Sequence, residues 1–268
     1  MKVTMLGTGM AVVKNCYNTC FVLSDGEDHF LVDGGGGSQI LKILGEKKIS
    51  LFGIHNIFVS HAHTDHLMGI IWVIRMLGHM IDANKYQGDL NIYCHQELSE
   101  GIKQICQIML GGKITKLFGK RIHFIEVKDG QVEMILDKEV IFFDLHSKKM
   151  TQFGFVMKKE NGEKLAFCGD EPLHERNTVL VENSEWLMHE AFCLYAERDI
   201  FKPYEKSHST VKEACELAEK LNIKNALLYH TEDTHMQDRK VLYLAEGQEY
   251  YRGNLYVPDD GEELEIFS

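Results

Sequence analysis

The chain has 268 residues, of which 44% are hydrophobic and 26% are charged, a composition typical of soluble globular domains. Its 29 basic and 40 acidic residues give a net charge of −11, which excludes a generally basic nucleic-acid coat and a polybasic membrane binder. A local basic patch is still compatible with this charge, and three prolines are too few for a Pro-rich linker.

Short runs rich in Val, Ile, Phe and Tyr, broken by Gly, Asn and Asp, predict many strands. In chain order these runs are Lys2–Leu6, Cys20–Leu23, Phe30–Val32, Asn56–Ser60, Leu90–Cys94, Arg121–Glu126, Val140–Leu145, Gly154–Lys158, Lys164–Cys168, Trp186–Glu190, Ala226–Tyr229 and Asn254–Val257. Apolar residues at helical spacing predict helices between them, over Ser38–Leu44, His66–His79, Gln96–Leu110 and Val211–Leu221. Ser209 or Thr210 could cap the last helix, with Glu213 completing a capping box. Many strands with interspersed helices and no linker predict one α/β domain over residues 1–268.

The cysteine pattern and the N-terminus predict a cytoplasmic protein. The seven cysteines are an odd number without a C-x-x-C pair, so we expect free thiols in a reducing compartment. The opening MKVTMLGTGM lacks the apolar stretch of a signal peptide. The longest apolar run, Met68 to Ile74, is too short to cross a bilayer, so we expect no membrane association.

The strongest functional signal is the segment Ser60-His61-Ala62-His63-Thr64-Asp65-His66, between an apolar strand and an apolar helix. In an extended loop His61 and His63 point the same way, because alternate residues share a face. Asp65 and His66 then begin the turn into the helix. Imidazole and carboxylate groups are suitable ligands for Zn²⁺, Mn²⁺ or Fe²⁺. A surface cluster of polar residues is the alternative, but this spacing seldom arises by chance, so the segment predicts a paired metal site.

This H-x-H-x-D-H pattern resembles the metallo-β-lactamase superfamily, and the resemblance covers most of the chain. Other segments resemble further motifs of that superfamily: Asp33 before four glycines, His146 before Ser147, Asp170 after Gly169, and His230 after Tyr229. The resemblance implies an αββα sandwich, two mixed sheets flanked by helices, with the site at one edge of the sheets. It implies one metal on His61, His63 and His146, a second on Asp65, His66 and His230, and Asp170 as the bridge.

Two points about this site stay open in the sequence. Asp33 fits either a local turn or a carboxylate that supports a metal-binding histidine. Nitrogen and oxygen ligands without a thiolate favour Zn²⁺ for both metals, and Mn²⁺ or Fe²⁺ are the alternatives.

Further residues resemble the phosphodiesterase branch, which includes ribonuclease Z. Zinc β-lactamases have a cysteine in place of Asp170, and flavodiiron reductases have a carboxylate in place of His63. His189-Glu190-Ala191-Phe192 resembles the branch's H-E-A-T motif, with Phe for Thr, and Ser207-His208-Ser209-Thr210 resembles its H-S-T motif. The resemblance implies that His208 meets the scissile phosphate as a general acid and that Glu190 orients it. Asp65 would serve both as metal ligand and as proton acceptor.

The chain also departs from ribonuclease Z. Asp170 follows His146 by only 24 residues, which leaves no room for the tRNA-gripping arm that the bacterial enzymes carry between these motifs. Two added carboxylates after His230 and the net charge do not suit a tRNA body. We therefore expect a dinuclear-zinc phosphodiesterase for a small or short substrate: a cyclic nucleotide, a cyclic ribose phosphate or a short RNA end.

Three other functions are alternatives. The first is a tRNA 3′-processing endonuclease of the ribonuclease Z type. Hydrolysis of thioesters or lactones is the second, and a non-catalytic, metal-stabilised binding protein is the third. A homodimer is compatible with the sequence.

Overall fold

The computed structural model describes residues 1–267, which contain strands interspersed with helices. The strands are β1 (Lys2–Gly7), β2 (Cys20–Asp25), β3 (Asp28–Val32), β4 (Ile54–Phe58), β5 (Leu90–Cys94), β6 (Ile122–Glu126), β7 (Val132–Ile135), β8 (Lys138–Asp144), β9 (Phe153–Lys158), β10 (Lys164–Phe167), β11 (Trp186–Glu190), β12 (Asn225–Tyr229), β13 (Asn254–Tyr256) and β14 (Glu263–Glu265). The α-helices are α1 (Gln39–Glu46), α2 (Thr64–Asp82), α3 (Gln96–Met109), α4 (Gly112–Thr115), α5 (Thr178–Val181), α6 (Arg198–Phe201), α7 (Val211–Lys220) and α8 (Arg239–Gly247). Short 3₁₀ turns are η1 (Leu51–Gly53), η2 (Glu175–Asn177), η3 (Tyr195–Glu197) and η4 (Tyr204–Lys206).

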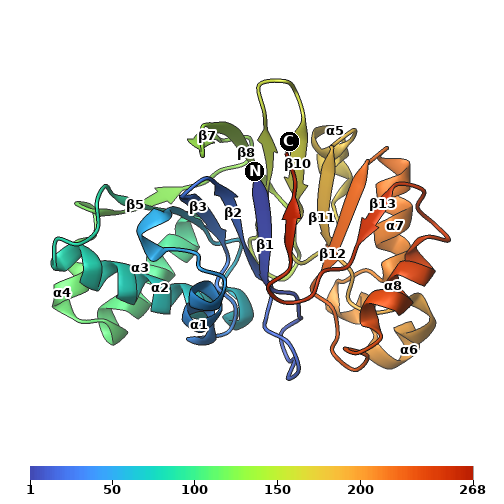
Figure 1. The fold of residues 1–268 in the computed structure, drawn as a ribbon, viewed down its shortest axis with the longest axis horizontal. Helices are drawn as coiled ribbons and strands as arrows, with labels where there is room; N and C mark the ends of the chain where they lie inside the picture. Colours follow the sequence, from blue (N-terminus) through green and yellow to red (C-terminus); the bar gives the residue numbers. More distant parts are fainter. Residues whose placement is uncertain (268) are drawn as a thin grey trace.

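The strands form two seven-stranded sheets (Figure 1). The first has the order β14-β1-β2-β3-β4-β5-β6 and the second the order β13-β12-β11-β10-β9-β8-β7. Each sheet is mixed: β3 to β6 and β10 to β13 pair in parallel, and the other neighbours are antiparallel. The chain crosses from the first sheet to the second after β6, and β14 returns to pair with β1.

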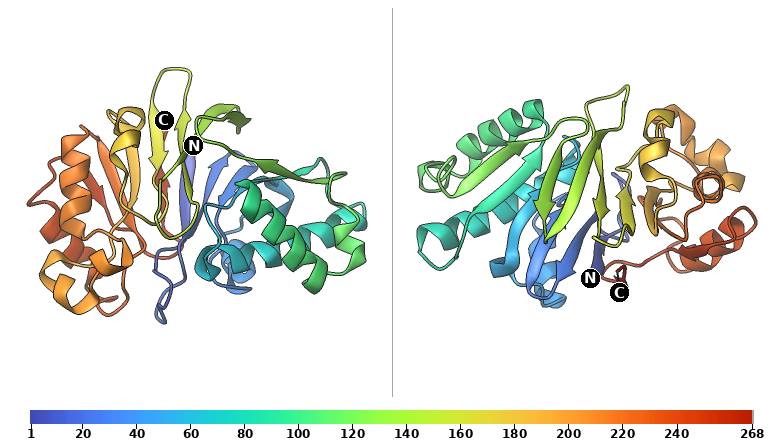
Figure 2. Two further views of the ribbon diagram at one scale, coloured as in Figure 1. Left: turned by 180° about the vertical axis from the view of Figure 1, so that it is seen from behind. Right: turned by 90° about the horizontal axis from the view of Figure 1, so that it is seen from above.

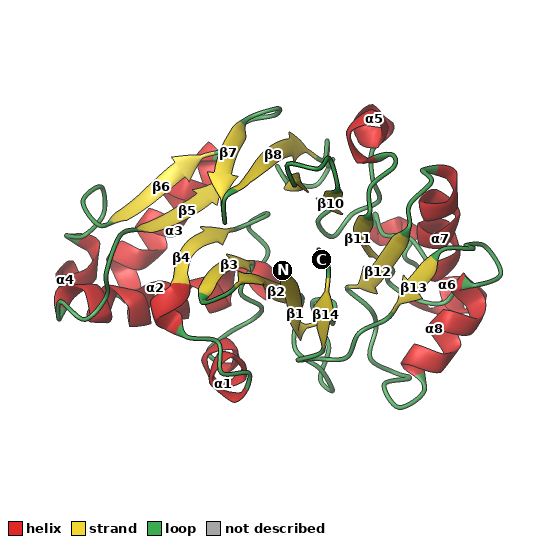
Figure 3. Cartoon of the chain, turned by 45° about the horizontal axis from the view of Figure 1, so that its top comes forward, coloured by secondary structure: helices red, strands yellow, loops and turns green. Residues whose placement is uncertain are grey.

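Helices cover the outer faces of the two sheets, so the predicted αββα sandwich is confirmed. Helices α1 to α4 lie beside the first sheet and α5 to α8 beside the second (Figures 2 and 3). Three apolar clusters match these layers, one between each sheet and its helices and one between the sheets. The central cluster is rich in phenylalanine, and pairs such as Phe21 with Phe167, with ring centroids 5.1 Å apart, join the two sheets. Such aromatic contacts add to the hydrophobic stabilisation of the sandwich.

Helix α2 packs unusually close to the turn after β3. An added Cβ at Gly69 would lie 1.7 Å from the carbonyl oxygen of Gly34. Gly34 N donates to His66 O at 2.8 Å, and Gly69 N donates to Gly35 O at 2.9 Å. The glycine run after Asp33 therefore lets the first turn of α2 pack directly against the end of β3.

Most predicted strands and helices are confirmed, but β7, β14, α8 and the four-residue helices α4, α5 and α6 were not predicted. The Thr210–Glu213 capping box begins α7 as expected. Helix α8 was not predicted because its buried face consists of Arg239, Tyr243 and Gly247 rather than aliphatic residues. Strand β14 has only three residues, too few for a visible alternation. Within residues 1–267, no helix combines the length and the apolar character that crossing a membrane requires.

Candidate metal centre and active site

The site forms where the carboxyl ends of several strands meet at one edge of the sandwich. The loop after β4 carries His61 and His63, and α2 starts at Thr64, so Asp65 lies in its first turn. From the second sheet, Asp170 follows β10 and His230 follows β12. Residues far apart in the sequence are brought together here because parallel neighbours end at the same edge of a sheet.

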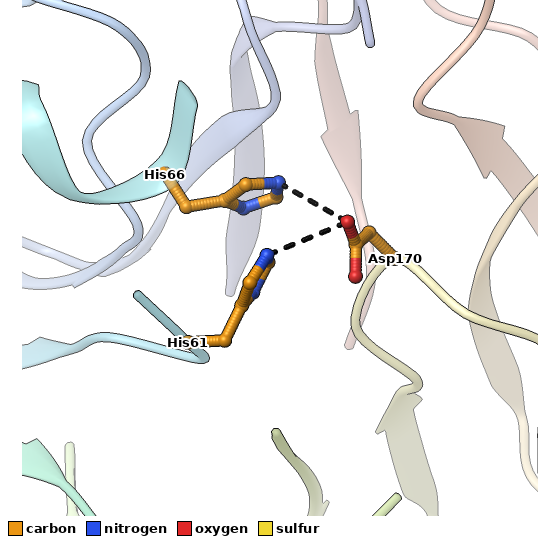
Figure 4. A group of neighbouring side chains, drawn as sticks. All are labelled: His61, His66 and Asp170. Atoms are coloured by element: carbon orange, nitrogen blue, oxygen red, sulfur yellow. Dashed lines mark ion pairs between the residues drawn. The ribbon is translucent and has the colours of Figure 1, made fainter. Parts of the chain in front are cut away.

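Asp170 lies at the centre of the cluster and is 3% exposed. Figure 4 shows its carboxylate facing the imidazoles of His61 and His66. Its Oδ2 lies 3.4 Å from His61 Nε2, 3.7 Å from His66 Nε2 and 3.8 Å from His230 Nε2. His63 is more distant, with Nδ1 at 3.9 Å from the same oxygen and 2.8 Å from His61 Nε2. A carboxylate surrounded by imidazoles from both sheets is suited to bridge two cations.

A second group of ligands adjoins the first. Ligand atoms of Asp65, His66 and His230 lie within 4.8 Å of one another, as do those of His61, His66 and Asp170. Asp65 Oδ2 is 3.4 Å from His66 Nε2. A third such triad joins Asp170 and His230 to His208. Three overlapping triads of buried groups are consistent with the paired site that the sequence predicted.

The residues present fit a pair of divalent cations. His66 Nε2 and Asp170 Oδ1 are buried without a hydrogen-bond partner, although a buried polar atom normally has one. Both atoms belong to residues of the cluster, so a cation would satisfy them. The donors are nitrogen and oxygen atoms without a thiolate, which suits Zn²⁺ and also Mn²⁺ or Fe²⁺.

The charges in the cluster favour metal-binding forms of two groups. Burial alone would raise the pKa of Asp170, but the imidazoles of His61, His63 and His66 hold it well below its usual range. Burial lowers the pKa of His230 to about 3, which keeps its ring neutral. A neutral imidazole and an ionised carboxylate are the forms that bind a metal.

Asp33 forms the turn after β3 and also contacts His66 of the cluster, so both interpretations of this residue from the sequence apply. It takes up a left-handed conformation, with φ of 56°, at the turn after β3. Its Oδ2 accepts from Ser60 Oγ at 2.7 Å and lies 2.8 Å from His66 Nδ1, and its Oδ1 accepts from Ser60 N at 2.8 Å. Thr19 Oγ1, which the sequence did not indicate, lies 3.1 Å from His230 Nδ1. Such contacts fix the ring orientation of metal-binding histidines.

His146 follows β8 at the same edge of the sheets but makes different contacts. Its Nδ1 lies 3.7 Å from Asp144 Oδ2, and its ring centroid is 4.9 Å from that of His174. It is not in any of the buried groups of metal-ligand geometry found within residues 1–267. Its role as a ligand stays a prediction.

His208 and Glu190 come together beside the metal cluster. His208 Nδ1 is 3.6 Å from Glu190 Oε2, and neither atom has a hydrogen-bond partner. The other oxygen of Glu190 accepts from Ser209 N at 2.5 Å and from Ser209 Oγ at 2.6 Å, which holds the carboxylate in place. The His208 ring stacks on Phe192 at 4.7 Å and lies 5.2 Å from the His230 ring. Phe192, at the position of the family threonine, therefore orients the ring of His208.

A pocket of about 320 Å³ opens over this cluster. The residues that line it are Met10, Ala11, Val12, His63, Thr64, Asp65, Asp170, Phe192, Lys206, His208 and His230. It joins the metal-ligand candidates to His208 and to one cation, Lys206, whose Nζ lies 4.7 Å from the Phe192 ring centroid. Lys206 was not predicted, although it stands only two residues before His208 in the sequence.

Glu171 is a second residue that the sequence analysis missed. It is buried, and its Oε1 accepts from Ser147 Oγ at 2.9 Å and from Gln152 Nε2 at 3.4 Å, with Lys149 Nζ at 3.5 Å. These contacts tie the loop that follows His146 to the turn that carries Asp170. An acidic residue directly after a candidate ligand was the one available signal.

The fold and the buried histidine–aspartate cluster define a metal-dependent hydrolase of the metallo-β-lactamase superfamily. A family model described as anti-Pycsar protein Apyc1 matches residues 1–250. The chain belongs to this family. The resemblance inferred from the hexad is therefore confirmed at the level of the superfamily and of its ribonuclease Z-like branch.

Similar sequences and similar solved structures were also found. Ribonuclease Z of Natronomonas pharaonis is 22% identical over 320 residues, covering 99% of this chain and 98% of the relative. Ribonuclease Z of Methanothermobacter thermautotrophicus is 27% identical over 293 residues, covering 91% of each chain. Among solved structures, human tRNase Z, short form, superposes with a TM-score of 0.77 at 20% identity over all of both chains. The metallo-β-lactamase fold protein YhfI of Bacillus subtilis gives 0.75 at 18% identity over 98% of both.

Proposed function

We propose that this protein is a dinuclear-metal phosphodiesterase that hydrolyses cyclic nucleotides, with Zn²⁺ as the metal. The observation that carries the proposal is the pocket that places Asp65, Asp170, His208 and His230 on one small cavity. Its volume of about 320 Å³ lies at the lower end of the range for small-molecule sites. Membership in the anti-Pycsar protein Apyc1 family supports a cyclic nucleotide as the substrate.

The proposed ligands are those inferred from the sequence: His61, His63, Asp65, His66, His146, Asp170 and His230. When bound, two cations would supply Lewis-acid charge to a phosphate oxygen and lower the pKa of an attacking water. Asp65 lies in the first turn of α2 and lines the pocket, so its carboxylate is placed to take the proton of that water. Thr19 and Asp33 hold the histidine rings in position while this occurs.

His208 is the proposed general acid. Its Nδ1 faces Glu190, which leaves Nε2 as the ring nitrogen available to a substrate in the pocket. Protonating the leaving alkoxide is worth about 10²–10⁴-fold in rate for a well-placed acid. Glu190 and the Phe192 stack position the ring, and Lys206 adds a positive charge for the phosphate or its ionised product.

Two features favour a small substrate over a tRNA. The segment between His146 and Asp170 is occupied by the β9–β10 hairpin, so it carries no additional arm. The net charge of −11 repels a polyanion that must be held by many phosphate contacts. Endonucleolytic processing of tRNA is the second candidate, because the curated relatives described above are named ribonuclease Z.

The test compares kcat/KM of the metal-loaded protein on 3′,5′-cyclic mononucleotides and on a precursor tRNA, at about 50 and 200 mM salt. We expect greater efficiency on a cyclic nucleotide and little change with salt, since a grip on many phosphates would weaken steeply over this range. Specific cleavage of the tRNA at higher kcat/KM, with a steep salt dependence, would instead identify a ribonuclease Z. Absence of any chelator-sensitive phosphodiester hydrolysis would refute both functions.

A pair of variants tests the role of His208. His208→Ala should lower kcat on the cyclic nucleotide by about 10²–10⁴-fold and leave the metal content unchanged. His79→Ala is the matched control, since His79 is exposed in the last turn of α2, about 21 Å along the helix from Asp65. Equal kcat values for the two variants would remove His208 from the mechanism.

A further inference from the structure

A second cluster of metal-ligating side chains lies outside the centre described above. Glu197 ends η3, while Glu232 and His235 belong to the segment that follows β12. One ligand atom from each of the three residues lies within 4.8 Å of the others. His235 Nε2 is 2.8 Å from Glu197 Oε1. Glu232 is one of the two added carboxylates that follow His230 in the sequence, and the proposed reaction does not use it.

Each of the two glutamates has one buried carboxylate oxygen without a hydrogen-bond partner. Glu232 is 1% exposed, and its Oε1 has no hydrogen-bond partner. Its other oxygen accepts from Thr234 N at 2.5 Å, so the carboxylate is fixed by its own loop. Glu197 Oε2 is also buried without a partner. Leaving two such oxygens unpaired is costly, which points to a cationic partner.

Neighbouring side chains do not supply that cation. Within residues 1–267, His235 is the one basic side chain found within 4.0 Å of either glutamate. Arg198, next to Glu197 in the chain, donates to Tyr195 O at 2.8 Å and stacks over the Tyr195 ring. His235 contacts Glu197 but makes no ion pair with Glu232, so one imidazole does not balance the two carboxylates of the cluster.

From this geometry we propose that Glu197, Glu232 and His235 form a third binding site for a divalent transition-metal ion, Zn²⁺ or Mn²⁺. Two carboxylates and one imidazole suit these ions, whereas Mg²⁺ and Ca²⁺ prefer ligand sets made of oxygen alone. A polar cavity of about 370 Å³, lined by Asn15 and by residues 233–238, reaches the cluster at His235. It provides solvent access for the ion and room for water ligands.

An ion at this site would join two segments that each lead to the active site. The segment from Glu197 continues through α6 and η4 to Lys206 and His208. The segment that carries Glu232 and His235 starts directly after His230, and Glu232 N donates to Phe192 O at 2.8 Å. The third ion would therefore order one wall of the substrate pocket without contacting the substrate.

The experiment counts metal ions in the purified full-length chain, stripped with chelator, reloaded with excess Zn²⁺ or Mn²⁺ and desalted. We expect three ions per chain for the wild type and two for Glu232→Gln and for Glu197→Gln, which preserve shape and remove charge. Glu249→Gln, an exposed glutamate on the same half of the molecule, is the matched control and should retain three.

A structural measurement makes the proposal independent of the variants. A crystal of the Mn²⁺- or Zn²⁺-loaded wild type should show an anomalous difference peak between Glu197, Glu232 and His235, besides those of the dinuclear centre. A wild type that retains two ions, with no anomalous peak at this cluster, overturns the third site. The same result would leave the proposed phosphodiesterase activity untouched, since that activity rests on the other centre.

Discussion

Replacing Asp33 by Asn tests whether the carboxylate behind the metal centre controls metal affinity. Asp33 lies at the end of β3 with φ of 56°, a conformation that Asn tolerates almost as well as Asp. The backbone therefore stays in place and the side chain keeps its shape. Only the negative charge and one acceptor oxygen are lost.

The magnitude follows from the three contacts of the carboxylate. Asp33 accepts from Ser60 N and Ser60 Oγ and faces His66 Nδ1 at 2.8 Å. The amide oxygen of Asn can replace Oδ1 and accept from Ser60 N, or replace Oδ2 and face Ser60 Oγ and His66 Nδ1, but its NH₂ group cannot accept at the other position. Loss of such a supporting acceptor typically weakens metal binding 10–100-fold, which corresponds to about 1.4–2.7 kcal/mol.

The assay is competition for Zn²⁺ against a chromogenic chelator at constant pH, with circular dichroism to confirm that the metal-free protein is folded. Asp28→Asn, an exposed position on the same strand, is the matched control and should bind like the wild type. If Asp33→Asn also binds Zn²⁺ with wild-type affinity, the carboxylate does not tune His66 and the reasoning is wrong.

Two further predictions concern stability and thiol chemistry. Gly69→Ala should lower the free energy of unfolding by about 1–3 kcal/mol, because the added Cβ would collide with Gly34 O. Thermal melts with chelator present measure this loss. An unchanged melting temperature would show that α2 can move away from Gly34. Burial raises the pKa of Cys106 and Cys215 to about 12, and burial together with Asp260 raises that of Cys16 to about 12, so thiolate is scarce at pH 8. Iodoacetamide should therefore label the native protein slowly and all seven cysteines after denaturation, as mass spectrometry would show. Rapid native labelling at several positions would contradict six buried thiols and one partly buried thiol, Cys16.

The sequence was sufficient to predict the parts of the site that lie close together in the chain or follow a strand. The hexad places His61 and His63 in the loop after β4 and Asp65 and His66 in the first turn of α2, so their clustering required only local geometry. Asp170 and His230 were assigned because they resemble further motifs of the superfamily and follow predicted strands in the expected order after the hexad. The sandwich architecture was likewise implied by that resemblance.

The remaining parts depend on how distant loops pack, and no local pattern records this. Thr19 reaches His230 across 211 residues of sequence, and Lys206 enters the pocket only because η4 folds over Phe192. Glu197 and Glu232 meet because a 3₁₀ turn lies against the loop after β12. Their spacing in the sequence has no characteristic period, so the third ligand cluster could be recognised only from the structure.

The division of the centre between the two sheets has a consequence for biosynthesis. His66 and Asp170 stand 104 residues apart, and the chain passes from the first sheet to the second through residues 127–131. Contacts of such long range form slowly, because a large loop must close before they contribute. During synthesis the hexad emerges well before Asp170 and His230, with which it forms the buried cluster. The cluster is therefore completed late in folding, when the phenylalanine layer joins the two sheets.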